Sequence, residues 1–270
     1  MKNFKNKIIV ITGASSGIGK ELALQLSKQG AFLSLAARSK EKLEVVAEVC
    51  KLKTGRVIVI PTDVSDKGQC KNLIDTTVKE YGKIDALINN AGITMWTMFE
   101  DITDIDLVEK IMKINYLGSV YCTYYALPQL KKSKGRIVGI SSLTGRTGVP
   151  TRTAYAASKF AMTGFFDSLR IELANSGVTV TMIYPGFVDT EIRGKELGAD
   201  GKQIGENKLS DAKTMDVKTC AKITINAIAK RKREVVMTLK GKLGMKLKLI
   251  APSLVDKIAQ KAVNIYPSEF

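Results

Sequence analysis

The sequence contains no histidine among its 270 residues. This absence excludes Ser-His-Asp and Cys-His catalytic triads, and it excludes every metal site that depends on histidine ligands. Any acid-base chemistry must therefore come from Tyr, Lys, Asp, Glu or Cys side chains.

Cysteines are few, and long apolar runs are missing from the start of the chain. The four cysteines, Cys50, Cys70, Cys122 and Cys220, lie far apart and form no C-x-x-C pair. This spacing argues against a zinc site, a redox motif and a secreted disulfide framework. The first apolar run, residues 8–11, is too short for a signal-peptide core or a membrane span. We therefore expect a cytoplasmic protein in a reducing environment.

Acidic residues are outnumbered: 26 Asp and Glu stand against 42 Lys and Arg, which gives a formal charge of +16. Such a surplus raises the question of an acidic partner, such as nucleic acid, an anionic membrane or a phosphorylated ligand. The basic residues are scattered, with clusters near residues 131–134, 230–233 and 240–248. Because no nucleic-acid-binding motif accompanies them, we expect no nucleic-acid partner and assign most of these residues to solvated surfaces.

Short apolar runs alternate with longer amphipathic segments along the chain. Strands are predicted at residues 7–12, 32–36, 56–61, 86–89, 135–141, 179–184 and 234–237, and helices at residues 20–29, 40–53, 67–81, 104–130, 155–175 and 216–230. This alternation is typical of a parallel sheet with helical crossovers. We predict a single α/β domain over residues 1–270, with a doubly wound, Rossmann-like sheet of about seven parallel strands. Residues 191–211 lack periodicity and are expected to form a mobile excursion.

A glycine-rich turn follows the first predicted strand and leads into a helix. Its spacing, G-x-x-x-G-x-G over residues 13–19, differs from the G-x-G-x-x-G fingerprint of many dinucleotide-binding proteins. Glycines let the backbone approach a pyrophosphate, whose charge is stabilised by free amides at a helix N-terminus. A purely structural turn would also use glycine, but the strand-turn-helix context favours cofactor binding by Gly13, Ser15, Ser16, Gly17, Ile18 and Gly19.

The end of the second predicted strand lacks the carboxylate that usually binds the ribose of NAD. Arg38 and Ser39 stand there instead. A guanidinium can bind a 2′-phosphate through paired hydrogen bonds, so this position predicts NADP(H) as cofactor. The alternative is a surface arginine at the start of the next helix.

Two further strands end in candidate ligands, at the sheet edge where doubly wound folds bind them. Asp63 and Val64 follow the third strand, and Asn90, Ala91 and Gly92 follow the fourth. Asp63 could accept a hydrogen bond from the adenine amine, but it is an equally good helix N-cap. The small residues leave room for a ribose.

Tyr155 and Lys159 are four residues apart on a predicted helix, so both side chains project from one face. An adjacent ammonium stabilises a phenolate and lowers the phenol pKa, which makes the tyrosine usable in acid-base catalysis. Taken alone, such a pair is more typical of a solvated helix face.

The combination of these motifs resembles the short-chain dehydrogenase/reductase family. The resemblance rests on residues 12–19 and 89–92, Asn115, Ser142 thirteen residues before Tyr155, the block 155–159, and Pro185 with Gly186. It implies that Tyr155 transfers a proton to or from a substrate oxygen that Ser142 also binds, with Ser141 the less suitable serine. It implies that Lys159 lowers the tyrosine pKa and binds the nicotinamide ribose.

The resemblance also implies roles for three other parts of the chain. Asn115 would bind a water connected to Lys159, although a polar residue in a helix interior is the simpler interpretation. Residues 184–190 would line the nicotinamide, with Pro185, Gly186, Val188 and Thr190 in contact. The segment near residues 191–215 would form a loop that covers the substrate.

Within the family, residues 126–139 and 158–166 are similar to the branch of corticosteroid and related lipid-ketone reductases. This similarity implies an NADP(H)-dependent reaction on an apolar carbonyl or alcohol substrate, in a homo-oligomer, either a dimer or a tetramer. Two alternatives are a 3-oxoacyl-thioester reductase, whose basic surface would dock an acidic carrier protein, and a non-catalytic dinucleotide sensor.

The segment near residues 239–263 mixes Lys with Leu, Ile and Met. A basic amphipathic segment can lie on an anionic membrane, which would place the protein peripherally at a membrane surface. It can equally cover the substrate pocket or form a subunit interface.

Overall fold

The computed structural model describes residues 4–54, 56–190, 195–205 and 214–261. Its centre is a parallel seven-stranded sheet with the strand order β3-β2-β1-β4-β5-β6-β7. The strands are β1 (Ile8–Thr12), β2 (Phe32–Ala37), β3 (Val57–Pro61), β4 (Ala86–Asn89), β5 (Arg136–Ile140), β6 (Thr179–Tyr184) and β7 (Glu234–Val236). The predicted doubly wound, Rossmann-like fold is confirmed.

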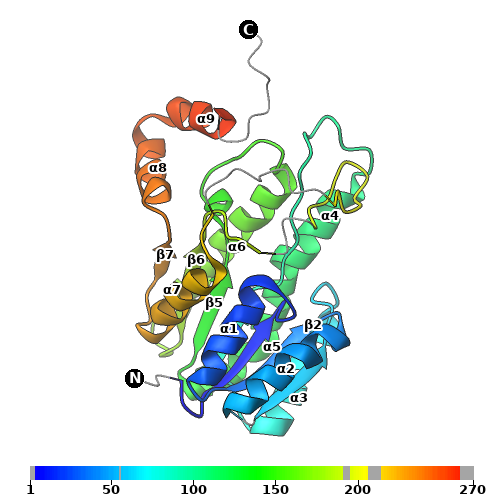
Figure 1. Ribbon diagram of the computed structural model, residues 1–270. Helices are drawn as coiled ribbons and strands as arrows, with labels where there is room; N and C mark the ends of the chain where they lie inside the picture. The colour runs from blue at the N-terminus through cyan, green and yellow to red at the C-terminus, as the bar shows by residue number, and fades with distance from the viewer. Residues whose placement is uncertain (1–3, 55, 191–194, 206–213, 262–270) are drawn as a thin grey trace.

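Helices cover both faces of this sheet (Figure 1). One face packs against α1 (Gly17–Lys28), α2 (Lys40–Thr54) and α7 (Val217–Ala229), and the other packs against α3 (Lys67–Tyr81), α5 (Gly118–Ser133) and α6 (Thr153–Glu172). Alternate residues of β1 serve the two layers: Ile9 and Ile11 point to the first and Val10 to the second. Because both faces are covered, the strands are continuously apolar, as the sequence indicates.

The strand order reverses beside β1, which pairs with β2 on one side and with β4 on the other. In doubly wound sheets such a switch point opens a crevice at the carboxyl ends of the strands. The turns after β1, β2, β3 and β4 therefore meet at one edge of the sheet, where the candidate ligands were predicted.

The long helix predicted over residues 104–130 is wrong in detail. The chain forms α4 (Asp106–Met112), then a π-helical stretch η1 (Lys113–Leu117), and then α5. The other predicted boundaries lie within a few residues of the observed ones, and a short 3₁₀ turn, η2 (Leu143–Gly145), follows β5.

The C-terminal segment forms two helices that project from the body of the molecule (Figure 1). They are α8 (Leu239–Ile250) and α9 (Pro252–Lys261), and residues 262–263 of the predicted segment lie outside the described residues. No helix in the described part of the chain is long and apolar enough to cross a bilayer.

The predicted loop near residues 191–215 is described at 195–205 and 214–215 only. Within that part, Leu197 is buried and pairs with Met95 through a parallel β-bridge. Its backbone amide donates to the Thr94 carbonyl at 3.0 Å, and its carbonyl accepts from the Trp96 amide at 2.9 Å. Residues 195–205 are thus anchored to the segment after β4.

Candidate active site

A cavity of about 1810 Å³ lies at the carboxyl ends of the strands. Ser142 lines it, and so do eighteen of the nineteen cofactor-binding residues predicted from the sequence: Gly13, Ser15, Ser16, Gly17, Ile18, Arg38, Ser39, Asp63, Val64, Asn90, Ala91, Gly92, Tyr155, Lys159, Pro185, Gly186, Val188 and Thr190. Gly19 and Asn115 do not line it.

The glycine turn is shaped by close backbone contacts. Gly13 and Gly17 have φ values of +64° and +52°, which favour glycine. A Cβ on Gly19 would lie 2.2 Å from the Gly13 carbonyl oxygen. Asn90 fixes the turn from β4, because its Nδ2 donates to the carbonyls of Thr12 at 2.9 Å and Gly13 at 3.2 Å. Gly19 and the Asn90 side chain therefore hold the shape of the turn, while the start of α1 faces the cavity.

Arg38 and Ser39 lie at the nucleotide end of the cavity, beside Lys42. Arg38 is exposed and makes no ion pair with any residue that the structure describes. The Ser39 hydroxyl donates to the Glu41 carboxylate at 2.9 Å and accepts from the Lys42 amide at 3.3 Å, so it stabilises the first turn of α2. Lys42 is a basic lining residue that the sequence reasoning missed.

Asp63 lines the cavity but does not cap a helix. Its carboxylate accepts from the amide and the hydroxyl of Ser65, at 2.9 and 2.7 Å. The N-cap of α3 is Asp66, which accepts from the amides of Gly68 and Gln69. The alternative role considered for Asp63 is therefore wrong, because the helix begins only at Lys67.

Ser142, Tyr155 and Lys159 meet in the middle of the cavity wall. Ser142 follows β5, and the other two residues come from the first turns of α6. Tyr155 and Ser142 share a side-chain hydrogen bond. The Lys159 Nζ lies 5.7 Å from the centre of the Tyr155 ring and donates to the Ile140 carbonyl at 2.9 Å.

Burial dominates the proton affinities of this group. It raises the pKa of Tyr155, while the Arg152 guanidinium and the hydrogen bond with Ser142 act in the opposite direction. Burial also lowers the pKa of Lys159 to about 8. The Arg152 guanidinium, which the sequence argument did not name, lowers the pKa of Tyr155, while the Lys159 ammonium donates to the Ile140 carbonyl. The role of Lys159 in lowering that pKa stays a prediction.

Asn115 lies in the π-helical stretch η1 and is fully buried. Its Oδ1 accepts from the Ile93 amide at 2.8 Å, and its Nδ2 donates to the Ile93 carbonyl at 2.9 Å and to the Ser158 hydroxyl at 2.9 Å. The side chain thus joins α6 to the segment after β4. Its own carbonyl accepts from the Ser119 hydroxyl at 2.9 Å.

The residues after β6 complete the nucleotide side of the cavity. Pro185, Gly186, Val188 and Thr190 line it. Backbone hydrogen bonds hold this segment in place, from Met215 to Phe187 at 2.8 Å and from Asp189 to Met215 at 2.9 Å.

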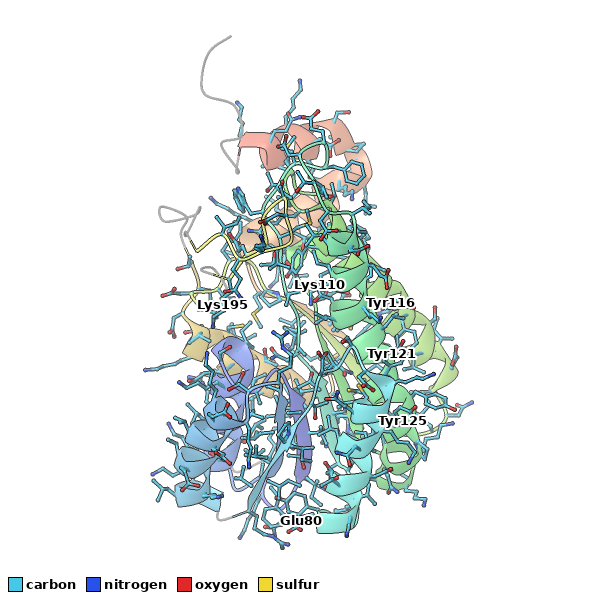
Figure 2. All side chains as sticks on the ribbon, turned by 90° about the vertical axis from the view of Figure 1, so that its right-hand side faces the viewer. Glu80, Lys110, Tyr116, Tyr121, Tyr125 and Lys195 are labelled. Carbon is cyan, nitrogen blue, oxygen red and sulfur yellow. The ribbon has the colours of Figure 1, made fainter. Side chains whose placement is uncertain are left out.

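The other end of the cavity is formed by the segment 195–203 and by α8 and α9. Lys110 of α4 and Lys195 both line the cavity, and Figure 2 shows them coming from opposite sides. Apolar residues of the two C-terminal helices, including Met245, Val255 and Ile258, contribute to this end. The C-terminal segment therefore covers part of the pocket, which is one of the alternatives considered for it.

Arg152 and Glu196 are further lining residues that the sequence reasoning missed. The Arg152 Nη2 donates to Glu196 Oε1 at 2.8 Å, and both side chains are buried. The only signal in the sequence was the place of Arg152, three residues before Tyr155. Its partner lies 44 residues away, and no local pattern connects the two.

Comparisons with known proteins agree with this geometry. The family model described as short chain dehydrogenase matches residues 7–200. The chain is 40% identical over 259 residues to the 11-beta-hydroxysteroid dehydrogenase-like 2 protein of Arabidopsis thaliana, covering 94% of this chain and 81% of that protein. It is 47% identical over 192 residues to the 11-beta-hydroxysteroid dehydrogenase-like 3 protein of the same plant, covering 71% of this chain and 62% of that one.

A solved structure shares the fold. The short chain dehydrogenase of Burkholderia cenocepacia, in complex with NADP, superposes with a TM-score of 0.79 and 23% identity, over 97% of this chain and 99% of that one. This likeness shows the fold, whereas the family match and the relatives show the family. The chain belongs to the short-chain dehydrogenase family of oxidoreductases, in its corticosteroid dehydrogenase-like branch.

Proposed function

We propose that this protein transfers a hydride between NADP(H) and the carbonyl or alcohol group of a mostly apolar small molecule. The observation that carries the proposal is the convergence of Ser142, Tyr155 and Lys159 on the wall of a cavity that also reaches the glycine turn. Proton transfer and nucleotide binding would then take place in one continuous space.

The nucleotide end fits a phosphorylated dinucleotide. The N-terminus of α1 presents backbone amides to the cavity, and the tight approach at Gly13 and Gly19 leaves no room for side chains there. Arg38, with Lys42 close by, supplies positive charge for a 2′-phosphate. The Burkholderia neighbour, which was solved with NADP, supports the same choice of cofactor.

The bound cofactor would supply the hydride for reduction or accept it in oxidation. Tyr155 would donate its phenolic proton to a carbonyl oxygen, or remove a proton from an alcohol. Ser142 would donate a hydrogen bond to the same oxygen. Because burial raises the pKa of Tyr155, the phenol is protonated at neutral pH, which suits reduction.

Lys159 and Asn115 would contribute without contacting the substrate oxygen: Lys159 would bind the cofactor, and Asn115 would fix the backbone beside it. The Lys159 ammonium lies close to Gly92, where an added Cβ would be 3.5 Å from Nζ, so it can reach a ribose bound against that glycine. Asn115 would hold the segment around Ile93 in place through its paired hydrogen bonds.

The substrate end favours an apolar molecule, because Leu197, Met245, Val255 and Ile258 line it. The names of the two Arabidopsis relatives, which refer to a hydroxysteroid, support a substrate with an apolar skeleton.

We also propose that α8 and α9 contact an anionic membrane surface. Leu243 and Ile250 of α8 are exposed, and Lys242 and Lys246 of the same helix are exposed as well. Exposed apolar residues flanked by lysines are typical of helices that lie at an interface.

A substrate screen that follows NADPH absorbance tests the enzymatic proposal, with ketosteroids, quinones, aldehydes and 3-oxoacyl thioesters as candidates. Tyr155→Phe should reduce turnover by about 100- to 10,000-fold, as expected for loss of a general acid, while NADPH binding stays nearly unchanged. Full activity in that variant would overturn the mechanism. Activity confined to thioesters would favour the thioester reductase, and NADPH binding without any turnover would favour a sensor.

A further inference from the structure

Beside Tyr155 lies an ion pair that the mechanism above does not use. The Arg152 Nη2 donates to Glu196 Oε1 at 2.8 Å, and Nη1 donates to the Thr94 hydroxyl at 2.6 Å. The Arg152 and Glu196 side chains are only 8% and 4% exposed. Buried ion pairs are often no more stabilising than apolar residues of similar volume, because both charges lose their hydration. The place of this pair therefore needs an explanation other than stability.

Residues 195–205 are attached to the body of the molecule by contacts other than the Arg152–Glu196 ion pair. Backbone hydrogen bonds already connect Leu197 to Thr94 and Trp96, and Thr97 to Thr151. Leu197 is also buried in an apolar cluster with Met95. Attachment of this segment therefore does not explain why two charged side chains, Arg152 and Glu196, are buried here.

The Arg152–Glu196 pair places two opposite charges, in a fixed orientation, close to the Tyr155 phenol. The Arg152 guanidinium lies 6.0 Å from the centre of the Tyr155 ring and 4.8 Å from that of Trp96. It lowers the pKa of Tyr155, whereas the Glu196 carboxylate raises it. The two members of one ion pair therefore act on the phenol in opposite directions.

Few other charges face this phenol. Lys159 lies 5.7 Å from the ring, and the residues packed with Tyr155 in its cluster are apolar. Lys110 and Lys195 line the same cavity, while Asp106 and Glu109 of α4 are exposed to solvent. Arg146, after η2, is paired with Glu234 and lies over the ring of Tyr184 instead.

We propose that Arg152 and Glu196 are positioning residues for Tyr155: the guanidinium stabilises the phenolate that remains after proton donation, and the carboxylate holds the guanidinium and moderates its charge. Preorganised charges of this kind stabilise a transition state because they need no rearrangement as charge develops. This inference rests on the proposed function, since it takes Tyr155 as the group that transfers the proton.

The test compares the pH dependence of kcat for alcohol oxidation in Arg152→Met, Glu196→Gln and the double variant. Oxidation needs the phenolate, so the rate rises as pH passes through the pKa of Tyr155. Arg152→Met should move that rise to higher pH, and Glu196→Gln should move it to lower pH. At a fixed pH on the rising part, we expect changes of about three- to tenfold in opposite directions.

A merely structural role predicts something different. Each single substitution breaks the same ion pair, so a structural effect would change both variants in the same direction, without opposite shifts along the pH axis. The double variant should lie between the two single ones. Shifts in the same direction, or no shift, would overturn the proposal.

A second measurement does not depend on turnover. The ionisation of Tyr155 is followed by ultraviolet absorbance in the whole protein, as the difference between each variant and the same variant carrying Tyr155→Phe. The same opposite shifts are expected even if the proposed reaction is wrong, so the two proposals can fail separately. Equal midpoints in Arg152→Met and Glu196→Gln would again overturn this one.

The Arg146–Glu234 pair offers a matched control. Arg146→Met and Glu234→Gln remove the same charges from a pair that lies over Tyr184, and they should leave the Tyr155 midpoint in place. If Arg152→Met does not fold, the proposal is tested by Glu196→Gln alone. This variant should fold, because the glutamine oxygen can still accept a hydrogen bond from the Arg152 guanidinium. Its midpoint must then fall below that of the unchanged protein.

Discussion

The two ends of the cavity are built in different ways. At the nucleotide end, the lining comes from turns directly after parallel strands, and its shape depends on backbone contacts such as Gly19 against Gly13. At the substrate end, side chains of residues 195–203, α8 and α9 form the wall, and α8 has no buried residue. The first end is thus fixed by the sheet, whereas the second depends on side chains of projecting helices.

A glycine substitution at each end gives the largest expected contrast. In Gly19→Ala the new Cβ would lie 2.2 Å from the Gly13 carbonyl oxygen and 2.5 Å from Asn90 Nδ2, so the turn must open. We expect a loss of about 1–3 kcal/mol in the free energy of unfolding, with NADPH affinity at least about tenfold weaker. Thermal unfolding and nucleotide titration measure both quantities.

Gly244→Ala is the matched control at the other end. A Cβ on Gly244 would meet no atom within 4 Å, and alanine favours helix by up to about 1 kcal/mol. Stability should therefore be unchanged or slightly higher, with normal NADPH affinity. Equal behaviour of the two alanine variants would contradict the contrast between the ends.

Lys159 lies between the two ends, and its burial predicts an effect of pH on stability. Because its pKa is about 8 rather than 10.5, the unfolded chain binds more protons between these values, and stability increases as pH rises through that window. Lys159→Met should therefore be more stable than the unchanged protein at pH 7, by about 2 kcal/mol after the lost hydrogen bond to Ile140 is subtracted.

Denaturant unfolding of both proteins at several pH values measures this difference, which should shrink toward pH 10.5 although activity is lost throughout. Lys53→Met, at an exposed position of α2, should show no such trend. A Lys159→Met variant that is less stable at pH 7 would show that the buried ammonium is compensated in the folded protein.

Arg38→Asp tests whether the nucleotide end selects the phosphorylated cofactor. Losing charge-assisted hydrogen bonds worth about 1.5–3 kcal/mol should weaken NADPH binding by roughly 10- to 100-fold relative to NADH. Titration with each nucleotide measures the ratio. Lys51→Asp makes the same charge change on α2, where Lys51 pairs with Glu48, and should leave the ratio unaltered; an unaltered ratio in Arg38→Asp as well would show that Arg38 is only a surface residue.

The smallest effect concerns the outer face of the substrate end. Leu243→Ser with Ile250→Ser removes two residues that are 72% and 84% exposed, so stability should hardly change. Binding to vesicles that contain phosphatidylserine should weaken about tenfold, and salt should weaken binding of the unchanged protein.

Val49→Ser with Leu52→Ser is the control, since these residues of α2 are also exposed. Sedimentation with vesicles measures both pairs. If the unchanged protein never sediments, the membrane proposal is wrong.

The nucleotide end was predictable because its signals are local. Buried strands give continuous apolar runs, and each is followed directly by its ligand candidates, as at Thr12 and Asn89. The substrate end could not be predicted from the sequence, because its contacts join segments that lie far apart along the chain. The pair of Arg152 with Glu196 spans 44 residues, and the orientation of α8 depends on packing that no periodicity records.

Asn115 shows a second limit. The sequence pointed to Asn115 but not to its hydrogen-bond partners. The pattern of helix-forming residues around it is the same for a regular α-helix and for a helix with a π-helical turn. The three hydrogen bonds of the Asn115 side chain become visible only when α6 and the segment after β4 are brought together.

That π-helical stretch has a consequence for chain length. Each residue turns an α-helix by about 100°, so the wide turn at η1 (Lys113–Leu117) shifts the angular phase of α5 relative to α4. Deleting one residue there would let a regular helix run through, but Asn115 and the apolar face of α5 could then no longer both keep their partners. At this place the number of residues matters as much as their identity.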